Sequence, residues 1–373
     1  MDTRDPAVVD ARPLATCLTQ GIREFHPAYF ALPMATGIVS IVSHLLGLAE
    51  ASAFLFWVNV PAYCAVWALS IVRLVAFPGQ LLRDLGSHQR GPGFFTSVAA
   101  TCVLGLQFVL LRGDTRTGYA LWWLGIVLWG ACTYAVFVLL AIREAKPSLA
   151  EGINGGWLVA VVATQSVCVL GCKVLAPRFA NGDGVFLFLA SLWLCGGMLY
   201  IWMISLIFYR YMFFRFHPSD LMPPYWINMG AVAISTVAGT SLSAAASGSA
   251  FLTQLLPFVN GLSLMFWATA TWWIPMLLIL GVWRHRALRI SYDPLYWGLV
   301  FPLGMYSLCT YRLGEVFALP FLGWIARAFA VAALAAWLLT FLGLAARLLR
   351  LVLLAGRSLP SVRGAVGSQP GSP

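Results

Sequence analysis

The strongest constraint on this chain is a series of apolar segments, each long enough to cross a lipid bilayer. A helix rises about 1.5 Å per residue, so roughly 20 residues cross a hydrocarbon core about 30 Å thick. Ten such segments can be drawn, at 27–47, 53–76, 92–111, 119–142, 155–175, 184–208, 224–247, 255–282, 294–313 and 320–346. They predict an all-α membrane protein with ten transmembrane helices.

The composition supports one membrane bundle rather than several soluble domains. Hydrophobic residues make up 61% of the chain and charged residues 10%, more apolar surface than a water-soluble fold can hide. We expect a ten-helix transmembrane domain at 25–350, preceded by a cytoplasmic tail at 1–24. Residues 351–373 include a stretch rich in Gly, Ser and Pro, which predicts a disordered cytoplasmic tail.

Basic residues predict the orientation. With the amino terminus inside the cell, 17 of the 23 Lys and Arg residues fall on the cytoplasmic side. This bias predicts a multi-pass protein of the inner or plasma membrane with both termini in the cytoplasm. The net charge of +10 therefore indicates attraction to anions and to membrane lipid, and gives no indication of nucleic-acid binding.

The odd-numbered segments reveal an internal repeat. They begin at Pro27, Pro92, Gly155, Pro224 and Pro294, separated by 65, 63, 69 and 70 residues. Each repeat contains two crossings and is therefore a helical hairpin. Since every copy enters the membrane in the same direction, the copies should be related by rotation about an axis normal to the bilayer. Five hairpins in a ring predict a pseudo-fivefold bundle around a central pore.

The two helices of each hairpin differ in composition. Gly, Ser and Thr account for 27 of 106 residues in the odd segments and 17 of 128 in the even ones, whereas 12 of the 16 tryptophans lie in the even segments. Small residues allow helices to approach closely or line a lumen, and tryptophan suits contact with lipid. We expect the odd helices to be inner and the even helices outer. The alternative is that the small residues only pack helix against helix.

The sequence offers little for catalysis. All 13 acidic residues lie outside the apolar segments or at their ends, so the intramembrane carboxylate of a typical proton-coupled carrier is missing. The histidines do not pair as haem ligands, and His26 and His44 are better explained as interfacial polar residues. Hydrolase, nucleotide-binding and zinc motifs are absent, and the eight cysteines lack metal-ligand spacing. We expect no enzyme, no catalytic residues, no cofactor and no metal.

What remains is a set of weakly polar residues on the odd helices. Hydroxyl groups can donate to an anion without holding it tightly, as conduction requires. We expect these to line the pore: Thr36, Ser40, Thr96, Thr101, Thr164, Ser166, Ser235, Thr236, Thr240 and Ser307. For any single one, the alternative is a hydrogen bond to the carbonyl four residues earlier in its own helix.

Two segments resemble a known family. The first apolar segment reads HPAYFALPMATGIVS from His26, and the ninth reads YWGLVFPL from Tyr296. Both are similar to the tellurite-resistance/C4-dicarboxylate transporter family, which includes the plant slow-type anion channels and fungal sulfite exporters. The ten-helix pattern extends the resemblance over residues 25–350.

The resemblance implies five kinked inner helices, a homotrimer, and a phenylalanine that plugs the pore. By its place before Pro302, that residue is Phe301, and the Phe301–Pro302 pair is the expected pore gate. Pro33 and Gly37, in the matching first segment, are expected to line the pore. A proline inside a helix bends its axis, which agrees with a ring carried across a lumen. The alternative is that Phe301 is an ordinary packing residue.

We therefore expect a gated channel or uniporter for small inorganic or organic anions. The alternative is a secondary carrier, possibly proton-coupled, for C4-dicarboxylate, sulfite or tellurite-type oxyanions. A membrane-bound redox enzyme is a third and weaker interpretation. The identity of the anion stays open, because hydroxyls and backbone dipoles accept many anions.

Overall fold

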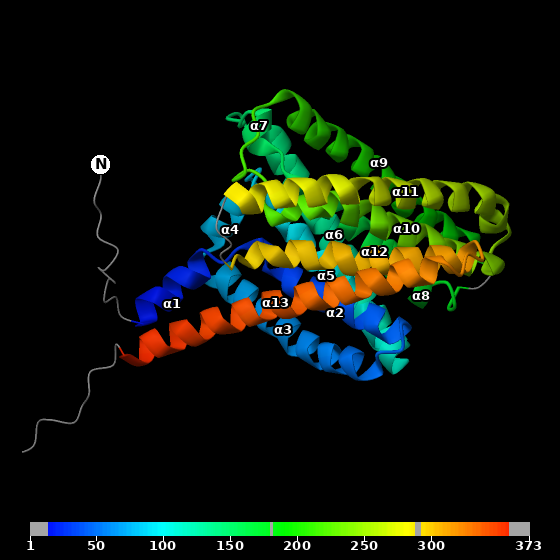
Figure 1. Cartoon of the computed structure of the whole chain (residues 1–373), viewed down its shortest axis with the longest axis horizontal. Coiled ribbons are helices and arrows are strands. Elements are labelled where there is room, and N and C mark those ends of the chain that lie inside the picture. The colour runs from blue at the N-terminus through cyan, green and yellow to red at the C-terminus, as the bar shows by residue number, and fades with distance from the viewer. Residues whose placement is uncertain (1–13, 180–181, 288–291, 358–373) are drawn as a thin grey trace, which may run out of the picture.

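The computed structural model describes residues 14–179, 182–287 and 292–357, and within these residues all regular structure is helical. The long helices run roughly along one direction and form a bundle (Figure 1). Shorter helices lie at one end of this bundle. The all-α class predicted from the sequence is confirmed.

Five helices of the bundle each begin with one 3-10 turn. The turns are η1 (Pro27–Phe30), η2 (Gly91–Phe94), η3 (Gly155–Leu158), η4 (Pro223–Trp226) and η6 (Pro294–Tyr296). They lead into α2 (Ala31–Leu45), α5 (Phe95–Arg112), α8 (Val159–Val174), α10 (Ile227–Ala245) and α12 (Trp297–Val316). The five residues that mark the repeat in the sequence stand first or second in these turns. Proline suits this position because its fixed φ is helical and its missing N–H has no partner there.

The other five long helices follow their partners after short connections. They are α3 (Ala49–Ala76), α6 (Thr115–Ile142), α9 (Asp183–Phe213), α11 (Ala250–Ala287) and α13 (Leu322–Arg357). Four short elements complete the described chain: α1 (Leu14–Arg23), α4 (Pro78–Leu85), α7 (Leu149–Gly152) and η5 (Ala246–Gly248).

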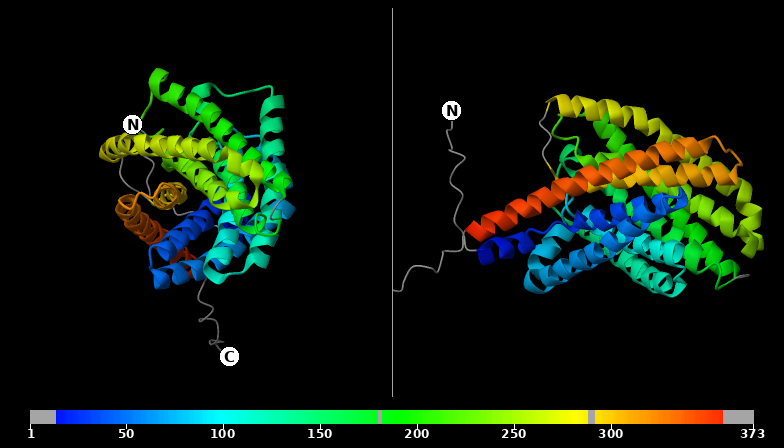
Figure 2. Two further views of the ribbon diagram at one scale, coloured as in Figure 1. Left: turned by 90° about the vertical axis from the view of Figure 1, so that its right-hand side faces the viewer. Right: turned by 60° about the horizontal axis from the view of Figure 1, so that its bottom comes forward.

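The helices pack as five hairpins in a ring. Within each hairpin the two helices contact each other: α2 with α3, α5 with α6, α8 with α9, α10 with α11, and α12 with α13. The first helices of the hairpins also contact one another in the order α2, α5, α8, α10, α12, and α12 returns to α2. Figure 2 (left) views the molecule from one end of this arrangement.

Burial separates the two kinds of helix. In α2, α5, α8 and α10 with their turns, 72% to 89% of the most apolar stretch is buried, against 17% to 44% in the five partner helices. The predicted division into inner and outer helices therefore agrees with the packing. Tryptophans on the outer helices, such as Trp57, Trp202 and Trp324, are exposed as lipid-facing residues should be.

Nine helices of the described chain are long and apolar enough to span a membrane. They correspond to nine of the ten predicted segments. The tenth, predicted at 294–313, forms η6 and α12, which is less apolar and is covered by α2, α10 and α13. A helix shielded from lipid by its neighbours needs less hydropathy than one that faces lipid. Its crossing of the membrane stays a prediction.

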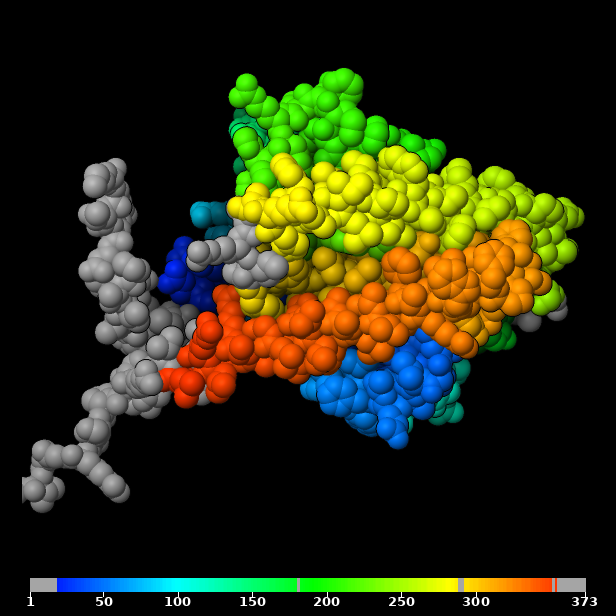
Figure 3. Space-filling view, in the orientation of Figure 1, coloured from blue at the N-terminus to red at the C-terminus, as the bar shows by residue number. Residues whose placement is uncertain are grey.

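The two ends of the described chain lie close to the same end of the bundle, where α1 and the last turns of α13 are found (Figure 1). On the face shown in Figure 3, α13 crosses obliquely between α11 and α3. Because α13 continues to Arg357, the first residues of the predicted disordered tail are helical. The remainder, 358–373, and residues 1–13 of the predicted amino-terminal tail lie outside the described residues.

Candidate functional site: a vestibule and an apolar axis

A cavity of about 310 Å³ lies where the five 3-10 turns meet. Each inner helix contributes to its wall, so the ring of hairpins encloses it. We call this cavity the vestibule. Its lining residues are His26, Ala28, Ala31, Met34, Gln89, Arg90, Pro92, Gly93, Thr96, Asn154, Gly156, Val159, Met222, Pro224, Ile227, Leu295 and Gly298.

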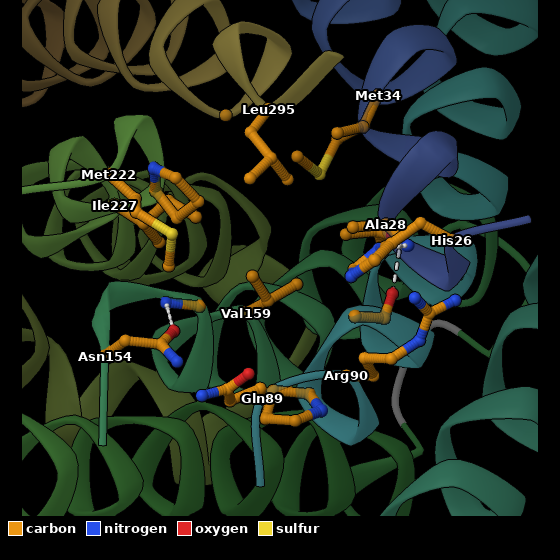
Figure 4. A pocket seen from close by; sticks show the side chains of 17 residues that line it. His26, Ala28, Met34, Gln89, Arg90, Asn154, Val159, Met222, Ile227 and Leu295 are labelled. Carbon is orange, nitrogen blue, oxygen red and sulfur yellow. Dashed lines mark hydrogen bonds between the residues drawn. The ribbon is translucent and has the colours of Figure 1, made fainter. Parts of the chain in front are cut away.

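The polar lining of the vestibule is gathered in one part of the wall. In Figure 4, Gln89 and Arg90 lie between His26 on one side and Asn154 on the other, and apolar side chains such as Met34 and Ile227 face them. These apolar side chains come from the first turns of inner helices. The vestibule therefore has a polar wall and an apolar wall.

His26 and Asn154 hold equivalent places in their repeats, as N-caps of the 3-10 turns. The Nδ1 atom of His26 accepts a hydrogen bond from the Ala28 backbone N–H at 3.0 Å, and the Oδ1 atom of Asn154 accepts from Gly156 N–H at 2.8 Å. Capping by a side-chain acceptor satisfies an N–H that the turn leaves unpaired. These two capping hydrogen bonds hold the side chains of His26 and Asn154 at the vestibule wall.

His26 is neutral at physiological pH. Burial, with the nearby Arg90 guanidinium as the second cause, lowers the pKa of His26 to about 4. Since Nδ1 accepts the bond from Ala28, the proton of the neutral ring sits on Nε2. His26 is thus a hydrogen-bond donor without a charge.

A buried charge cluster supports the vestibule beside η2. Asp84 is 3% exposed and pairs with two arginines, Arg73 at 2.5 Å and Arg90 at 2.9 Å. The Arg90 Nη2 atom also donates to the carbonyls of Glu24 and Phe25. Two guanidinium groups face one carboxylate, so the cluster carries one excess positive charge.

An arginine near the end of each outer helix adds to the positive charge at this end. Four of them donate to groups around the turns, and the fifth lines a neighbouring cavity of about 260 Å³ with His26 and Asp293. These arginines and their partners are Arg73 with Arg23 O, Arg143 with Gly86 O, Arg210 with Ile153 O and Tyr225 Oη, Arg284 with Tyr296 Oη, and Arg347 at the cavity.

Beyond the vestibule the axis of the ring is apolar and closed. The space there is only about 10 Å³, at the lower limit for one water molecule. All five inner helices line it, with Ile38, Cys102, Val103, Leu106, Ser166, Val169, Leu170, Ile234, Val237, Met305 and Leu308. This part of the axis has no room for a hydrated ion or for a file of water molecules.

Phe301 stands between these two spaces in the register of α12. Gly298, three residues earlier, lines the vestibule, and Met305, four residues later, lines the narrow space. Residues at this spacing share one face of a helix, so the Phe301 side chain is on the face that turns to the axis. Phe301 is fully buried. Its role as a gate stays a prediction.

Pro302 packs against α10. A Cβ atom added at Gly230 would come within 2.9 Å of Pro302 Cγ, so the glycine allows the two helices to approach closely. The same holds for Gly37 on α2, where an added Cβ would meet Val103 and the amides of Asn59 and Gln107. Pro33 is buried near the start of α2.

Two of the ten hydroxyl residues predicted to line the pore lie at these cavities, Thr96 at the vestibule and Ser166 at the narrow space. The others are hydrogen bonded within their helix or to an outer helix. Their partners are Trp337 for Thr36, Ser52 O for Ser40, Tyr63 for Thr101, Trp129 for Thr164, Ala231 O for Ser235, Val232 O and Ser263 O for Thr236, Thr236 O and Val237 O for Thr240, and Ala326 O for Ser307. A lining role for these eight stays a prediction.

These bonds reveal how successive repeats are joined. Each outer helix places a polar aromatic side chain on the inner helix of the next repeat. The pairs are Tyr63 with Thr101, Trp129 with Thr164, Trp193 with Ser235 O, Trp267 with Thr310, and Trp337 with Thr36, at 2.8 to 3.0 Å. The hydroxyls of Thr36, Thr101 and Thr164 therefore form hydrogen bonds that join one repeat to the next.

Sequence reasoning missed Asn154 and Gln89 and treated His26 only as an interfacial residue. A signal was available for two of them. His26 and Asn154 each precede a residue that opens a repeat, as a cap precedes a helix start. Gln89 has no such pattern, and only the fold brings it to the vestibule.

Comparison with known proteins agrees with this architecture. An uncharacterised transporter of Methanocaldococcus jannaschii is 26% identical over 315 residues, which cover 82% of this chain and 89% of that protein. An uncharacterised membrane protein of Mycobacterium tuberculosis is 37% identical over 177 residues, 45% of this chain and 85% of its own length. A sulfite efflux pump of Arthroderma benhamiae is 23% identical over 348 residues, 86% of this chain and 90% of the pump.

A family-level match decides the assignment. The profile of the voltage-dependent anion channels matches residues 24–345, which include the first four hairpins and most of the fifth. The resemblance noted in the first and ninth apolar segments is thereby confirmed, as is the expectation that the chain is not an enzyme. This multi-pass membrane protein belongs to the voltage-dependent anion channel family.

Proposed function

We propose that this protein is a passive, gated channel for small anions, with its path along the axis of the five-hairpin ring. The vestibule is the cytoplasmic entrance, the ten long helices all cross the membrane, and both termini lie in the cytoplasm. Three copies associate as a homotrimer in the inner or plasma membrane. Each copy carries its own pore.

The observation that supports the proposal is the register of α12 around Phe301. Gly298, three residues before it, lines the wide vestibule, and Met305, four residues after it, lines a space too small for an ion. An anion passing an apolar constriction would lose hydration and gain nothing in exchange, so the Phe301 ring is an effective barrier. Pro302 removes one backbone hydrogen bond at this point and makes bending of α12 easier.

Charge supports anions as the substrate. The vestibule end carries the excess positive charge of the cluster around Asp84, which includes Arg73, and the arginines of the other four outer helices. Among the residues that the structure describes, none of those lining the vestibule is acidic. Such a surface raises the local concentration of anions and repels cations.

A secondary carrier is the second candidate, favoured by the names of relatives that are sulfite efflux pumps. A proton-coupled carrier usually relays its proton through a carboxylate within the membrane. In the described chain, the inner helices hold one carboxylate, Glu315, in the last turn of α12 and paired with Arg312. We therefore place the channel first.

Electrical recording of purified protein in planar bilayers tests this function. Phe301→Ala should pass anion currents that reverse near the equilibrium potential of the anion, without a pH gradient. Wild-type protein should pass little current under the same conditions. Flux that saturates, needs a proton gradient and carries no such current would favour the carrier, and cation-selective current would reject both candidates.

A further inference from the structure

The polar wall of the vestibule carries hydrogen-bond donors that no described residue uses. The Nδ2 atom of Asn154 makes no hydrogen bond within the described chain, although this side chain is only 8% exposed and its Oδ1 atom is held by Gly156. The Nε2–H of His26 is likewise without a partner among the described residues. Since both residues line the vestibule, and neither donor atom is among the fully buried unpaired ones, both donors are open to a ligand or to water in this cavity.

The two donors reach the vestibule from different repeats. His26 precedes η1 and Asn154 precedes η3, and they lie on opposite sides of the cavity with Arg90 and the exposed side chain of Gln89 between them (Figure 4). Glycines at 93, 156 and 298 keep the wall open around them. A ligand lying here would meet donors on two sides and a positive charge on a third.

We propose that the vestibule binds a singly charged oxyanion between the side-chain N–H groups of Asn154 and His26, beside Arg90. This assignment rests on the proposed function, since it names the anion class and its first binding site in the same path.

The charge of the ligand follows from the cluster behind Arg90. Asp84 compensates one of the two guanidinium groups of Arg73 and Arg90, so one positive charge remains for the ligand. A doubly charged anion would be left with one uncompensated charge in a partly buried site, which is unfavourable. An oxyanion has several acceptor oxygens and can therefore accept from both side chains, directly or through a bridging water. The cavity of about 310 Å³ also leaves room for bound water.

The structure itself suggests the test variants. In η6 the same capping place is held by Asp293, whose Oδ1 atom accepts from Leu295 N–H at 2.8 Å. An aspartate is therefore compatible with this kind of turn. Asn154→Asp and His26→Asp should keep the cap while replacing a free donor by a negatively charged acceptor. Asp293→Asn is the matched control, because it changes the charge of the same kind of cap outside the vestibule lining, and removal of a negative charge near His26 should not weaken nitrate binding.

Nitrate is the probe, and the unfolding temperature of the detergent-purified protein is the first measurement. At constant ionic strength, nitrate should stabilise wild-type protein and Asp293→Asn in a saturable manner. Asn154→Asp and His26→Asp should need at least tenfold more nitrate for the same shift. Sulfate should stabilise wild-type protein less than nitrate does.

Nitrate flux through liposomes is the second measurement, in the Phe301→Ala background. The KM should rise at least tenfold in Asn154→Asp, with a maximal rate within about twofold of the parent, and should not rise in Asp293→Asn. Equal nitrate protection of wild-type protein and Asn154→Asp would overturn the site. Stronger protection by sulfate would overturn the charge assignment. If nitrate protects the protein in a manner that depends on Asn154 but no nitrate flux is measured, the binding site stands and only the proposed channel function is contradicted.

Discussion

The indole Nε1 of Trp337 donates a hydrogen bond of 2.9 Å to the hydroxyl of Thr36, across 301 residues of sequence. Trp337 lies on the last outer helix and Thr36 on the first inner helix, so this bond joins the fifth repeat to the first and closes the ring. The indole also stacks on Phe341, with ring centroids 4.8 Å apart. The contact is thus both polar and apolar.

Loss of this bond should weaken the ring measurably. We expect Trp337→Phe to lower the free energy of unfolding by about 1 kcal/mol, the usual net contribution of an interhelical hydrogen bond. A double-mutant cycle with Thr36→Val, followed by chemical or thermal unfolding, should give a coupling energy of about 0.5–1.5 kcal/mol. Trp324→Phe, at a tryptophan that is 66% exposed, is the control and should change little. If the stability losses of the two single variants simply add in the double variant, the bond does not couple the repeats.

The charge cluster around Asp84 predicts a larger effect. Asp84→Asn removes the carboxylate and leaves the buried Arg73 and the partly exposed Arg90 without a counter-ion. We expect a loss of about 3–5 kcal/mol and a lower yield of folded protein. Asp114→Asn changes charge equally but at a partly exposed cap that asparagine can replace, so its stability should stay nearly the same. Similar unfolding temperatures for the two variants would contradict this account of the cluster.

His26 should make stability depend on pH. Its folded pKa is about 4, below the unfolded value of 6.5, so protons bind more readily to the unfolded chain. The stability contributed by neutral His26 is present above pH 6.5 and is lost as the pH falls from 6.5 to about 4. The loss should be on the order of 2–3 kcal/mol. The charged groups that act on this ring are Arg90, Asp84, Arg73 and Asp293.

The measurement is the unfolding temperature between pH 7.5 and pH 4.5 for wild-type protein and His26→Asn. The variant keeps a side-chain acceptor for the Ala28 N–H, as Asn154 does for Gly156, but position 26 no longer carries a group that titrates in this range. Its stability should therefore fall less than that of wild-type protein as the medium is acidified. Parallel curves for the two proteins would assign the acid sensitivity to other residues.

The fold was largely predictable because its main signals are linear in sequence. Hydropathy marks the spans, and the prolines and glycine at 27, 92, 155, 224 and 294 mark the turns that open each inner helix. The partition of tryptophan and small residues indicates which helices face lipid. Among the described residues, α12 is the inner helix that hydropathy alone does not mark as a span. Its neighbours cover it, so it needs fewer apolar residues than a helix that faces lipid.

The site was less predictable, because composition does not reveal which face of a helix turns inward. Thr36, Thr101 and Thr164 each stand nine residues after the start of their repeat, and this common register turns their hydroxyls to an outer helix. The narrow part of the axis is instead lined mainly by residues such as Ile38 and Val169. A hydroxyl in an apolar helix can form a hydrogen bond with any nearby partner. The sequence therefore shows that a polar group is present, but does not show to which side of the helix it points.

Truncation of Phe301 should give a graded series that separates gating from packing. We expect conductance in the order Phe301→Ala above Phe301→Leu above wild type, because the smaller groups leave more room for water while keeping the site apolar. Phe95→Ala is the matched control. Phe95 is 1% exposed on α5, but its ring lies 5.8 Å from that of Phe137 on the outer helix α6.

Stability measured on the same preparations completes the test. Phe95→Ala should lose about 3–5 kcal/mol without a gain in current, as a packing phenylalanine does. Phe301→Ala should lose less, because Gly298 on the same helix face lines the vestibule and we expect water from there to fill the vacated space. If Phe301→Ala is destabilised as strongly as Phe95→Ala and conducts no better than wild type, Phe301 is a packing residue. The closed part of the axis at Ile38 and Met305 would then be the barrier that a gating transition has to open.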